Sequence, residues 1–324
     1  MKRFKTLKKI SSAVALSIMA TTIIGCGSSD DDAPANDGKI SIDFDTIVGS
    51  QGSLVCSENG NAKVYTDLGK DGTNSGTIAD FRYFVSDLKV IFEDQSTETL
   101  VLDTNSYQYY DETNGSVAIL DFEDATGNCV DRGNDVDTNK SVTATLSDEN
   151  KDKSIINVEF TVGVPQYLNH VQFTDIEALN KTSMAWSWQS GRKFTKFEIN
   201  PENSEEVSRF NYHLGSTGCV STEDEHVDGS SQECAQPNRA KMNFDMDPTT
   251  QKIVLDYSKL LTNVDITTDL GGAAGCMSGL TDPECSADSG KMLNMIGLDD
   301  DNEVGLCIDG DCTSNQQLFS VTDK

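Results

Sequence analysis

The chain is poor in basic residues, histidine, tryptophan and proline. It has 25 Lys plus Arg against 53 Asp plus Glu in 324 residues, with three histidines, two tryptophans and six prolines. Five of the basic residues lie within the first ten positions, and the first acidic residue is Asp30. The chain after residue 25 is therefore more acidic than the chain as a whole, and its negative electrostatic field repels phosphate backbones. This excludes nucleic acid as a partner.

Motifs of the common enzyme classes are also missing. The sequence has no Gly-x-Ser-x-Gly, no His-Glu-x-x-His, no phosphate-binding loop and no Gly-x-Gly-x-x-Gly after a strand. A c-type haem would need Cys-x-x-Cys-His, which is absent as well. The sequence thus contains no nucleophile or cofactor motif that would indicate a hydrolase or an oxidoreductase acting on a small substrate. We therefore expect a protein that is not an enzyme.

Residues 1–25 have the features of a lipoprotein signal peptide, with a basic start followed by an apolar run too short to span a bilayer. Gly25 precedes Cys26, the arrangement that bacterial lipoprotein processing recognises. Cys26 is therefore predicted to carry the lipid that anchors the protein to a membrane. Residues 26–38 form a flexible acidic tether. Gly27, where Asp would favour retention at the inner membrane, predicts the outer membrane, facing the periplasm or the cell surface.

The remaining cysteines are even in number, which in an exported chain indicates disulfides. Cys307 and Cys312 flank Asp309-Gly310, the tip of a predicted hairpin, so a bridge across its stem is natural. Proximity and elimination suggest three more pairs. These are Cys219 with Cys234, Cys276 with Cys285, and Cys56 with Cys129.

Alternating apolar and polar residues dominate the chain after residue 38, as in 40–44, 142–146 and 156–160, and longer β-type runs cover 81–92, 186–199 and 207–214. Helical signals are limited to 176–181, with Thr174-Asp175 as a cap, and 257–261. At 36% hydrophobic residues the chain can build a core. We therefore predict an all-β fold: residues 39–324 as a single β-sandwich domain with long disulfide-pinned loops and few short helices.

Few residues are candidates for binding chemistry. His170 and His213 offer imidazoles, which suit copper, whereas each taken alone is more often a structural histidine. Trp186 and Trp188 point to the same face of a strand, and their spacing alone favours packing. Acidic clusters at 131–137 and 299–303 offer oxygen ligands for calcium, although neither follows the calcium-loop pattern.

An ordered series of motifs covers most of residues 40–320. Its pieces are DFRYFVSD (80–87), LDFE (120–123) with TGNC (126–129), GVP (163–165) leading to Asn169-His170, SMAWSWQSGRKF (183–194), HLGSTGC (213–219), CAQPNR (234–239) and GCMS (275–278). In this order they resemble the MbnP-like family, the four-Cys-motif proteins of metallo-mystery pair systems.

The resemblance implies a copper-associated protein of the cell envelope whose partner is a diheme c-type cytochrome of the MauG/peroxidase type. In the family, the partner oxidises a tryptophan of this protein to kynurenine. Carried over, the modified residue is Trp186 or Trp188, and His170 and His213 are the imidazole ligands of copper. Ala185 and Arg192 depart from the bulky residue and the tyrosine expected there, so the pocket lining is expected to differ.

The alternative hypothesis is a structural or adhesive surface module. In that case disulfides, with or without calcium, stabilise the domain and the tryptophans only pack. It predicts a melting temperature that responds to calcium rather than to copper.

Overall fold

Two β-sheets make up most of the structure, a computed structural model that describes residues 37–129, 137–171, 176–187, 191–220, 233–279, 281–286, 291–299, 305–307 and 310–324. The unit that contains these sheets spans Asn36–Lys324. The predicted signal peptide, Cys26 and all but the last two residues of the tether lie outside the described residues. The all-β prediction is confirmed. Within the described residues, no helix is long and apolar enough to cross a bilayer.

The smaller sheet has five strands in the order β21-β19-β1-β10-β7. Their bounds are β1 (Lys39–Ile47), β7 (Val101–Leu102), β10 (Ser141–Thr145), β19 (Gln251–Asp256) and β21 (Phe319–Asp323). Strand β1 pairs antiparallel with β10 through its first half and parallel with β19 through its second half. Its alternation places Ile42 and Phe44 in the core.

The larger sheet has ten strands arranged around one long strand, β5. Their bounds are β4 (Val64–Leu68), β5 (Asn74–Phe92), β6 (Thr97–Thr99), β8 (Gln108–Asp111), β9 (Gly115–Asp121), β11 (Ile155–Val162), β14 (Thr195–Pro201), β15 (Phe210–Tyr212), β18 (Ala240–Asp245) and β20 (Gly275–Cys276). The 19 residues of β5 pair with β14 and then β11, and also with β4, β9 and β6.

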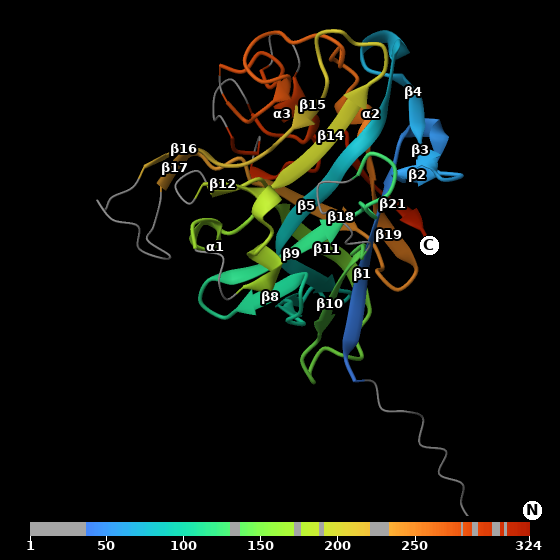
Figure 1. Ribbon diagram of the computed structural model, residues 1–324. Helices are drawn as coiled ribbons and strands as arrows, with labels where there is room; N and C mark the ends of the chain where they lie inside the picture. Colours follow the sequence, from blue (N-terminus) through green and yellow to red (C-terminus); the bar gives the residue numbers. More distant parts are fainter. Residues whose placement is uncertain are drawn as a thin grey trace, which may run out of the picture. The chain divides into compact units, whose positions relative to one another are not determined.

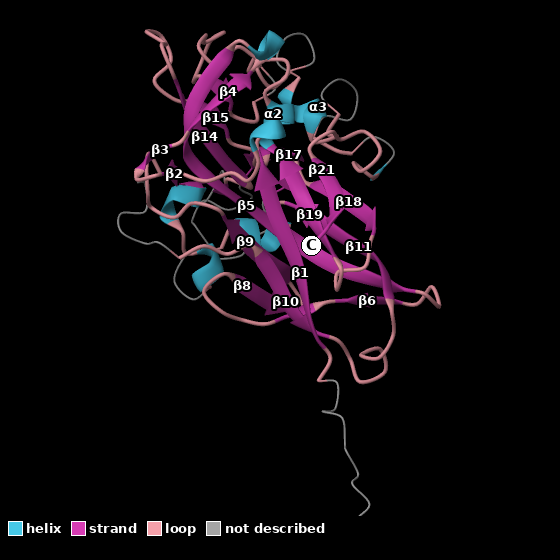
Figure 2. Cartoon of the chain, turned by 90° about the vertical axis from the view of Figure 1, so that its right-hand side faces the viewer, coloured by secondary structure: helices cyan, strands magenta, loops and turns pink. Residues whose placement is uncertain are grey.

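Aromatic side chains hold the two sheets together as a sandwich. Phe44 of β1 packs edge-on against Phe160 of β11, with ring centroids 5.5 Å apart, and Phe319 of β21 packs on both Phe160 and Tyr83 of β5. Figure 2 shows β1, β19 and β21 alongside β5, β11 and β18. Such edge-to-face pairs add to the large apolar area that these rings bury.

Strands β14 and β11 meet end to end at Phe84 of β5. The Phe84 N–H donates to the carbonyl of Phe194, and the Phe84 carbonyl accepts from the N–H of Gly163. Residues 163–194 therefore leave the sheet between the end of β11 and the start of β14. This excursion contains His170, Trp186 and Arg192, so the paired backbone of β5 anchors the segment with most of the candidate site residues.

The remaining described elements are short. They are α1 (Gln166–Asn169), α2 (Tyr257–Leu260), α3 (Met292–Met295), the 3-10 turns η1 (Gly49–Gln51), η2 (Lys70–Gly72), η3 (Glu177–Leu179) and η4 (Thr182–Met184), and the two-stranded pairs β2 (Ser57–Glu58) with β3 (Asn61–Ala62), β12 (Ala185–Ser187) with β13 (Gly191–Arg192), and β16 (Thr217–Val220) with β17 (Glu233–Gln236). The helix predicted at 257–261 is α2.

Two predictions of local structure differ from the structure. The helix expected over 176–181 is replaced by the turns η3 and η4, neither of which has a side-chain cap, and the expected cap residues Thr174 and Asp175 lie outside the described part. The continuous strand expected over 186–199 is divided into β12, β13 and β14. Gly191 has φ +74°, a left-handed conformation that a continuous strand does not contain.

Four disulfides join the pairs predicted from the sequence. They are Cys56 with Cys129, Cys219 with Cys234, Cys276 with Cys285, and Cys307 with Cys312. Asp309, at the expected tip of the last hairpin, lies outside the described residues.

Candidate functional site

The candidate residues come from three neighbouring parts of the fold: the 163–194 excursion, the chain that follows β15, and the β16–β17 hairpin. Figure 1 shows α1, β12 and this hairpin on the same side of the unit. The backbone after β15 is fixed by β20, because the His213 N–H donates to the carbonyl of Cys276 at 2.9 Å. Excursion and hairpin are thus both attached to the larger sheet.

His170 follows α1 and is 1% exposed. Its neighbour Asn169 is oriented by Arg192, whose backbone N–H donates to Asn169 Oδ1 at 2.7 Å. That bond turns the amide nitrogen of Asn169 toward His170 Nε2, at 3.3 Å. Because an amide nitrogen can only donate, Nε2 is the acceptor and carries a lone pair on this side.

The guanidinium of Arg192 holds the backbone around His170. It donates to the carbonyls of Leu168 and Asn169 at 2.8 Å and of Val171 at 3.0 Å. Arg192 is 2% exposed, and burial lowers its pKa to about 10. Gly191 permits the close approach, since a Cβ there would lie 2.4 Å from the Asn169 amide nitrogen. The arginine that departs from the family pattern therefore positions a candidate ligand.

His213 is 5% exposed and makes a different contact, to a carboxylate. Its Nε2 lies 2.8 Å from Glu198 Oε1. The other ring nitrogen, Nδ1, is buried and has no hydrogen-bond partner within the described residues. A buried polar atom without a partner is costly, and it commonly marks a place where a ligand or ion supplies the partner.

The protonation of this pair follows from its surroundings. Burial alone would raise the pKa of Glu198, but the hydrogen bond from His213 and the charges of Lys196 and Arg209 outweigh it and lower the pKa to about 2. Burial also lowers the pKa of His213, and Lys193 and Lys196 add to that effect. At neutral pH an ionised Glu198 can only accept, so the neutral imidazole carries its hydrogen on Nε2 and its lone pair on Nδ1.

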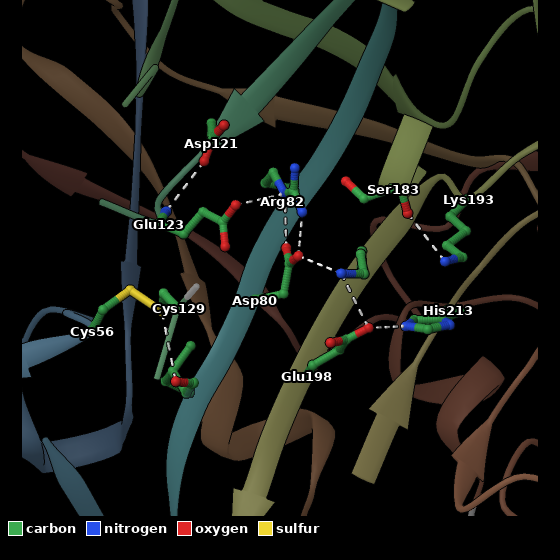
Figure 3. A network of polar contacts seen from close by, with 12 residues as sticks. Cys56, Asp80, Arg82, Asp121, Glu123, Cys129, Ser183, Lys193, Glu198 and His213 are labelled. Carbon is green, nitrogen blue, oxygen red and sulfur yellow. Dashed lines mark hydrogen bonds and ion pairs between the residues drawn. A yellow bond between two sulfur atoms is a disulfide. The ribbon is translucent and has the colours of Figure 1, made fainter. Parts of the chain in front are cut away.

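Glu198 belongs to a chain of buried charges that crosses β14 and β5. Lys196 contacts both Glu198, at 3.3 Å, and Asp80, which in turn pairs with Arg82. Arg82 also faces Glu123 at 3.3 Å. Figure 3 shows the alternation of acidic and basic groups from Glu123 to His213. Each charge has an opposite neighbour, which is what makes their burial tolerable.

Trp186 lies half-buried on β12, and its ring covers Gly215, two residues after His213. A Cβ at Gly215 would lie 2.5 Å from Trp186 Cζ3 and 2.8 Å from the Arg192 carbonyl. The Ser278 hydroxyl donates to the His213 carbonyl and accepts from the Gly215 N–H. The indole therefore rests on the same short segment that presents His213. Trp188 lies outside the described residues.

The two candidate histidines contact different side chains. His170 Nε2 lies 3.6 Å from Cys234 Sγ, and within the described residues His170, Cys219 and Cys234 form the group of three or more candidate metal ligands. His213 is not in that group. For calcium, residues 131–136 and 300–303 lie outside the described part, as does His226, so the acidic clusters are described only at Asp137 and Asp299.

The residues at His213 fit a copper ion. A neutral imidazole with an unpartnered Nδ1 is a suitable copper donor, and a carboxylate on the opposite N–H is the usual partner of a metal-bound histidine. Four residues of this network were not predicted as site residues from the sequence: Glu198, Lys196, Asp80 and Arg82. Their signal was present as Asp-x-Arg on β5 and Lys-x-Glu on β14, with charges two residues apart between aromatic neighbours.

Comparisons with known proteins identify the family of this chain. The family model described as MbnP matches residues 37–278. The solved structure of MbnP from Methylosinus trichosporium is similar, with a TM-score of 0.71 and 27% sequence identity over 88% of this chain and 98% of that one. No curated protein sequence matches. The chain belongs to the MbnP family.

Proposed function

We propose that this protein is an exported, non-enzymatic copper-binding lipoprotein whose Trp186 is oxidised to kynurenine by a diheme c-type partner of the MauG/peroxidase type. Its role is the acquisition or handling of copper. Cys26 carries the lipid that attaches the chain to the outer membrane. Family membership supports the class of protein, and the geometry around His213 supports the metal.

The observation that carries the proposal is the buried Nδ1 of His213, which has no hydrogen-bond partner in the described residues. Glu198 accepts from the opposite nitrogen at 2.8 Å and keeps the lone pair on Nδ1. A protein that needed His213 only for packing would gain nothing from a buried nitrogen without a partner. His170, with its Nε2 lone pair set by Asn169, is the second imidazole of the proposal.

Trp186 is the choice for the modified residue because its ring touches the segment that carries His213. Oxidation breaks the C2–C3 bond of the indole and adds two oxygen atoms, taken from two water molecules. The four electrons leave through the partner, which reduces two molecules of peroxide to water and consumes the four protons released. Hydrolysis then releases formate. The product has a ketone and an aryl amine, and their lone pairs can face a metal held by imidazole.

Copper, when bound, supplies a redox-active ion at this place. The chain's own residues hold it and fix the orientation of the donors. Glu198 sets the tautomer of His213, while Arg192 and Asn169 set the orientation of His170. Lys196 and Arg209 keep Glu198 ionised in a buried position.

The test is production of the full chain with and without the diheme partner, followed by peptide mass analysis and copper titration. We expect the Trp186 peptide to lose one carbon and gain one oxygen only with the partner, and the modified protein to bind copper. Trp188→Phe is the matched control and should leave both results unchanged, whereas Trp186→Phe should abolish both. Unmodified Trp186, together with no copper uptake that depends on His213, would refute the proposal.

A further inference from the structure

One disulfide differs from the other three in its access to solvent. Cys219 and Cys234 are both half-buried on the β16–β17 hairpin, whereas the other six cysteines are at most 6% exposed. Thiol–disulfide exchange requires the attacking thiolate to reach a sulfur atom. A dithiol reductant can therefore reach Cys219–Cys234 while the protein stays folded, and the three buried disulfides are protected.

The same two sulfurs lie beside a buried imidazole. His170 Nε2 is 3.6 Å from Cys234 Sγ, and the ligand atoms of His170, Cys219 and Cys234 all lie within 4.8 Å of one another. Because Asn169 donates toward Nε2, this nitrogen carries the lone pair of the ring and not its hydrogen. While the disulfide is closed its sulfurs are weak ligands. Once it is opened they are thiols, which bind a metal as thiolates.

The hairpin keeps the two sulfurs together after the S–S bond is broken. Cys219 and Cys234 are direct partners in the antiparallel register, between the pairs Thr217 with Gln236 and Val220 with Glu233. The base of the hairpin is held independently, since Ser216 Oγ donates to the Pro237 carbonyl at 2.9 Å and Asn238 Nδ2 donates to the Gly215 carbonyl at 2.7 Å. Backbone pairing, not only the disulfide, places both side chains.

We propose that reduction of Cys219–Cys234 creates a second metal site, in which two thiolates and His170 bind Cu(I). The S–S bond takes up two electrons and two protons from a dithiol, which itself becomes a disulfide, and copper binding then releases the thiol protons to solvent. Soft thiolates with imidazole in a three-coordinate set favour Cu(I), whereas structural zinc sites take four protein ligands. The site shares His170 with the proposed function and needs neither His213 nor an oxidised tryptophan.

The test uses the full chain made without the diheme partner, with Trp186 shown intact by mass. The protein is reduced with a dithiol, desalted without oxygen, and labelled with iodoacetamide for peptide mapping. A matched sample is titrated with Cu(I) against a chromogenic Cu(I) chelator. We expect label on Cys219 and Cys234 and not on the six cysteines of the other three disulfides, and one more equivalent of Cu(I) than in the oxidised protein.

Two variants and one competing metal make the result decisive. His170→Gln should lower the affinity for the additional Cu(I) about tenfold or more, since even the loss of a residue that only hydrogen-bonds to a metal ligand lowers metal affinity by that much. Cys219→Ser with Cys234→Ser should remove it; if that variant does not fold, reduced wild-type protein blocked with iodoacetamide serves instead.

Equal Cu(I) uptake by oxidised and reduced protein, or full retention in His170→Gln, would overturn the proposal, as would zinc displacing Cu(I) at equal concentration. Because Trp186 is unmodified in every sample, failure here leaves the kynurenine-dependent site intact. Likewise, a failure to find the kynurenine-dependent site would not contradict the site formed by Cys219, Cys234 and His170.

Discussion

At the scale of single residues, the site depends on neighbouring side chains that assign the hydrogen positions of its histidines. Glu198 does so directly for His213, with a pKa held at about 2 by the hydrogen bond and by neighbouring cations in spite of its burial. Its replacement changes which nitrogen of His213 holds the lone pair. The effect should therefore be on metal affinity more than on folding.

Glu198→Gln is predicted to lower copper affinity by about 10- to 100-fold, the usual cost of losing the carboxylate partner of a metal-bound histidine. An amide can donate as well as accept, so it no longer keeps the hydrogen on Nε2. Chelator competition on protein made with the diheme partner measures the change. Glu159→Gln, a carboxylate on β11 paired with Lys89, is the control and should bind as the wild type. Equal affinities in both variants would contradict the role given to Glu198.

Arg82→Met is predicted to destabilise the fold by about 3–5 kcal/mol, because it leaves buried carboxylates without their cation. Arg82 is 1% exposed and lies between Asp80 and Glu123. Urea denaturation gives the difference in the free energy of unfolding. Lys89→Met removes a more exposed ion pair and should cost less than ~1 kcal/mol. Similar losses in the two variants would mean that the buried chain of charges is not what stabilises this region.

At the scale of elements, close backbone approaches decide where the site segments lie. Trp186 on β12, the Arg192 carbonyl on β13 and Gly215 after β15 come together because residue 215 has no side chain.

Ile156 illustrates a different element-scale effect. The alternation of 156–160 places it with Val158 and Phe160, yet it is 39% exposed, because a register shift between Ile155 and Asn157 changes the phase of β11.

Gly215→Ala is predicted to cost about 1–3 kcal/mol of stability, since the added methyl meets the Trp186 ring and a backbone carbonyl that cannot move aside cheaply. It should also change the tryptophan emission. Gly279→Ala is the matched control, because a Cβ there has its nearest contact at 3.6 Å. Thermal unfolding followed by fluorescence measures both effects. No difference between the two variants would place Trp186 elsewhere.

Asp265 ties the loop after α2 to the start of β5. Its side chain accepts from Thr267 and from Asn74 Nδ2, and the Thr267 hydrogen bond is the main reason that its pKa is lowered. A carboxylate whose pKa is lowered in the folded state stabilises the protein at pH values above its unfolded-state pKa, about 3.9. This contribution is lost as the pH falls through the folded-state pKa.

Asp265→Asn keeps an acceptor but cannot titrate. We therefore predict that the wild type loses more stability than this variant when pH is lowered from 5 to 3. Urea midpoints at the two pH values measure the loss. An equal loss in both proteins would show that Asp265 does not contribute to the acid sensitivity.

At the scale of the whole molecule, the sandwich encloses its aromatic core and the disulfides close loops of very different length. Cys56–Cys129 spans 73 residues of sequence, whereas Cys307–Cys312 spans five. Both are buried. The acidic surface implied by the net charge of −28 favours solubility and contributes little to the choice of fold.

Replacing both cysteines of Cys56–Cys129 with alanine is predicted to cost about 4 kcal/mol, against about 2 kcal/mol for Cys307–Cys312, because a longer closed loop restricts the unfolded chain more. Calorimetry on the two double variants measures the difference. A larger cost for the short loop would indicate that contacts of the folded state dominate instead.

The sequence by itself determined the all-β class, the positions of β1, β5, β10 and α2, and the three local disulfide pairs, because these depend on alternation over a few residues and on closeness along the chain. The fourth pair, Cys56 with Cys129, followed by elimination, because its cysteines are 73 residues apart. It also singled out His170, His213 and the pair Trp186 and Trp188, without choosing between the two tryptophans. Only the tertiary structure decided that Lys196 and Glu198 are buried, because the alternation Lys-Phe-Glu-Ile indicates one polar face and cannot tell whether other segments cover it. The same holds for the hydrogen positions on His213, which depend on Glu198, 15 positions away in the chain. It also holds for the contact of His170 with Cys234, which lie 64 positions apart in the chain.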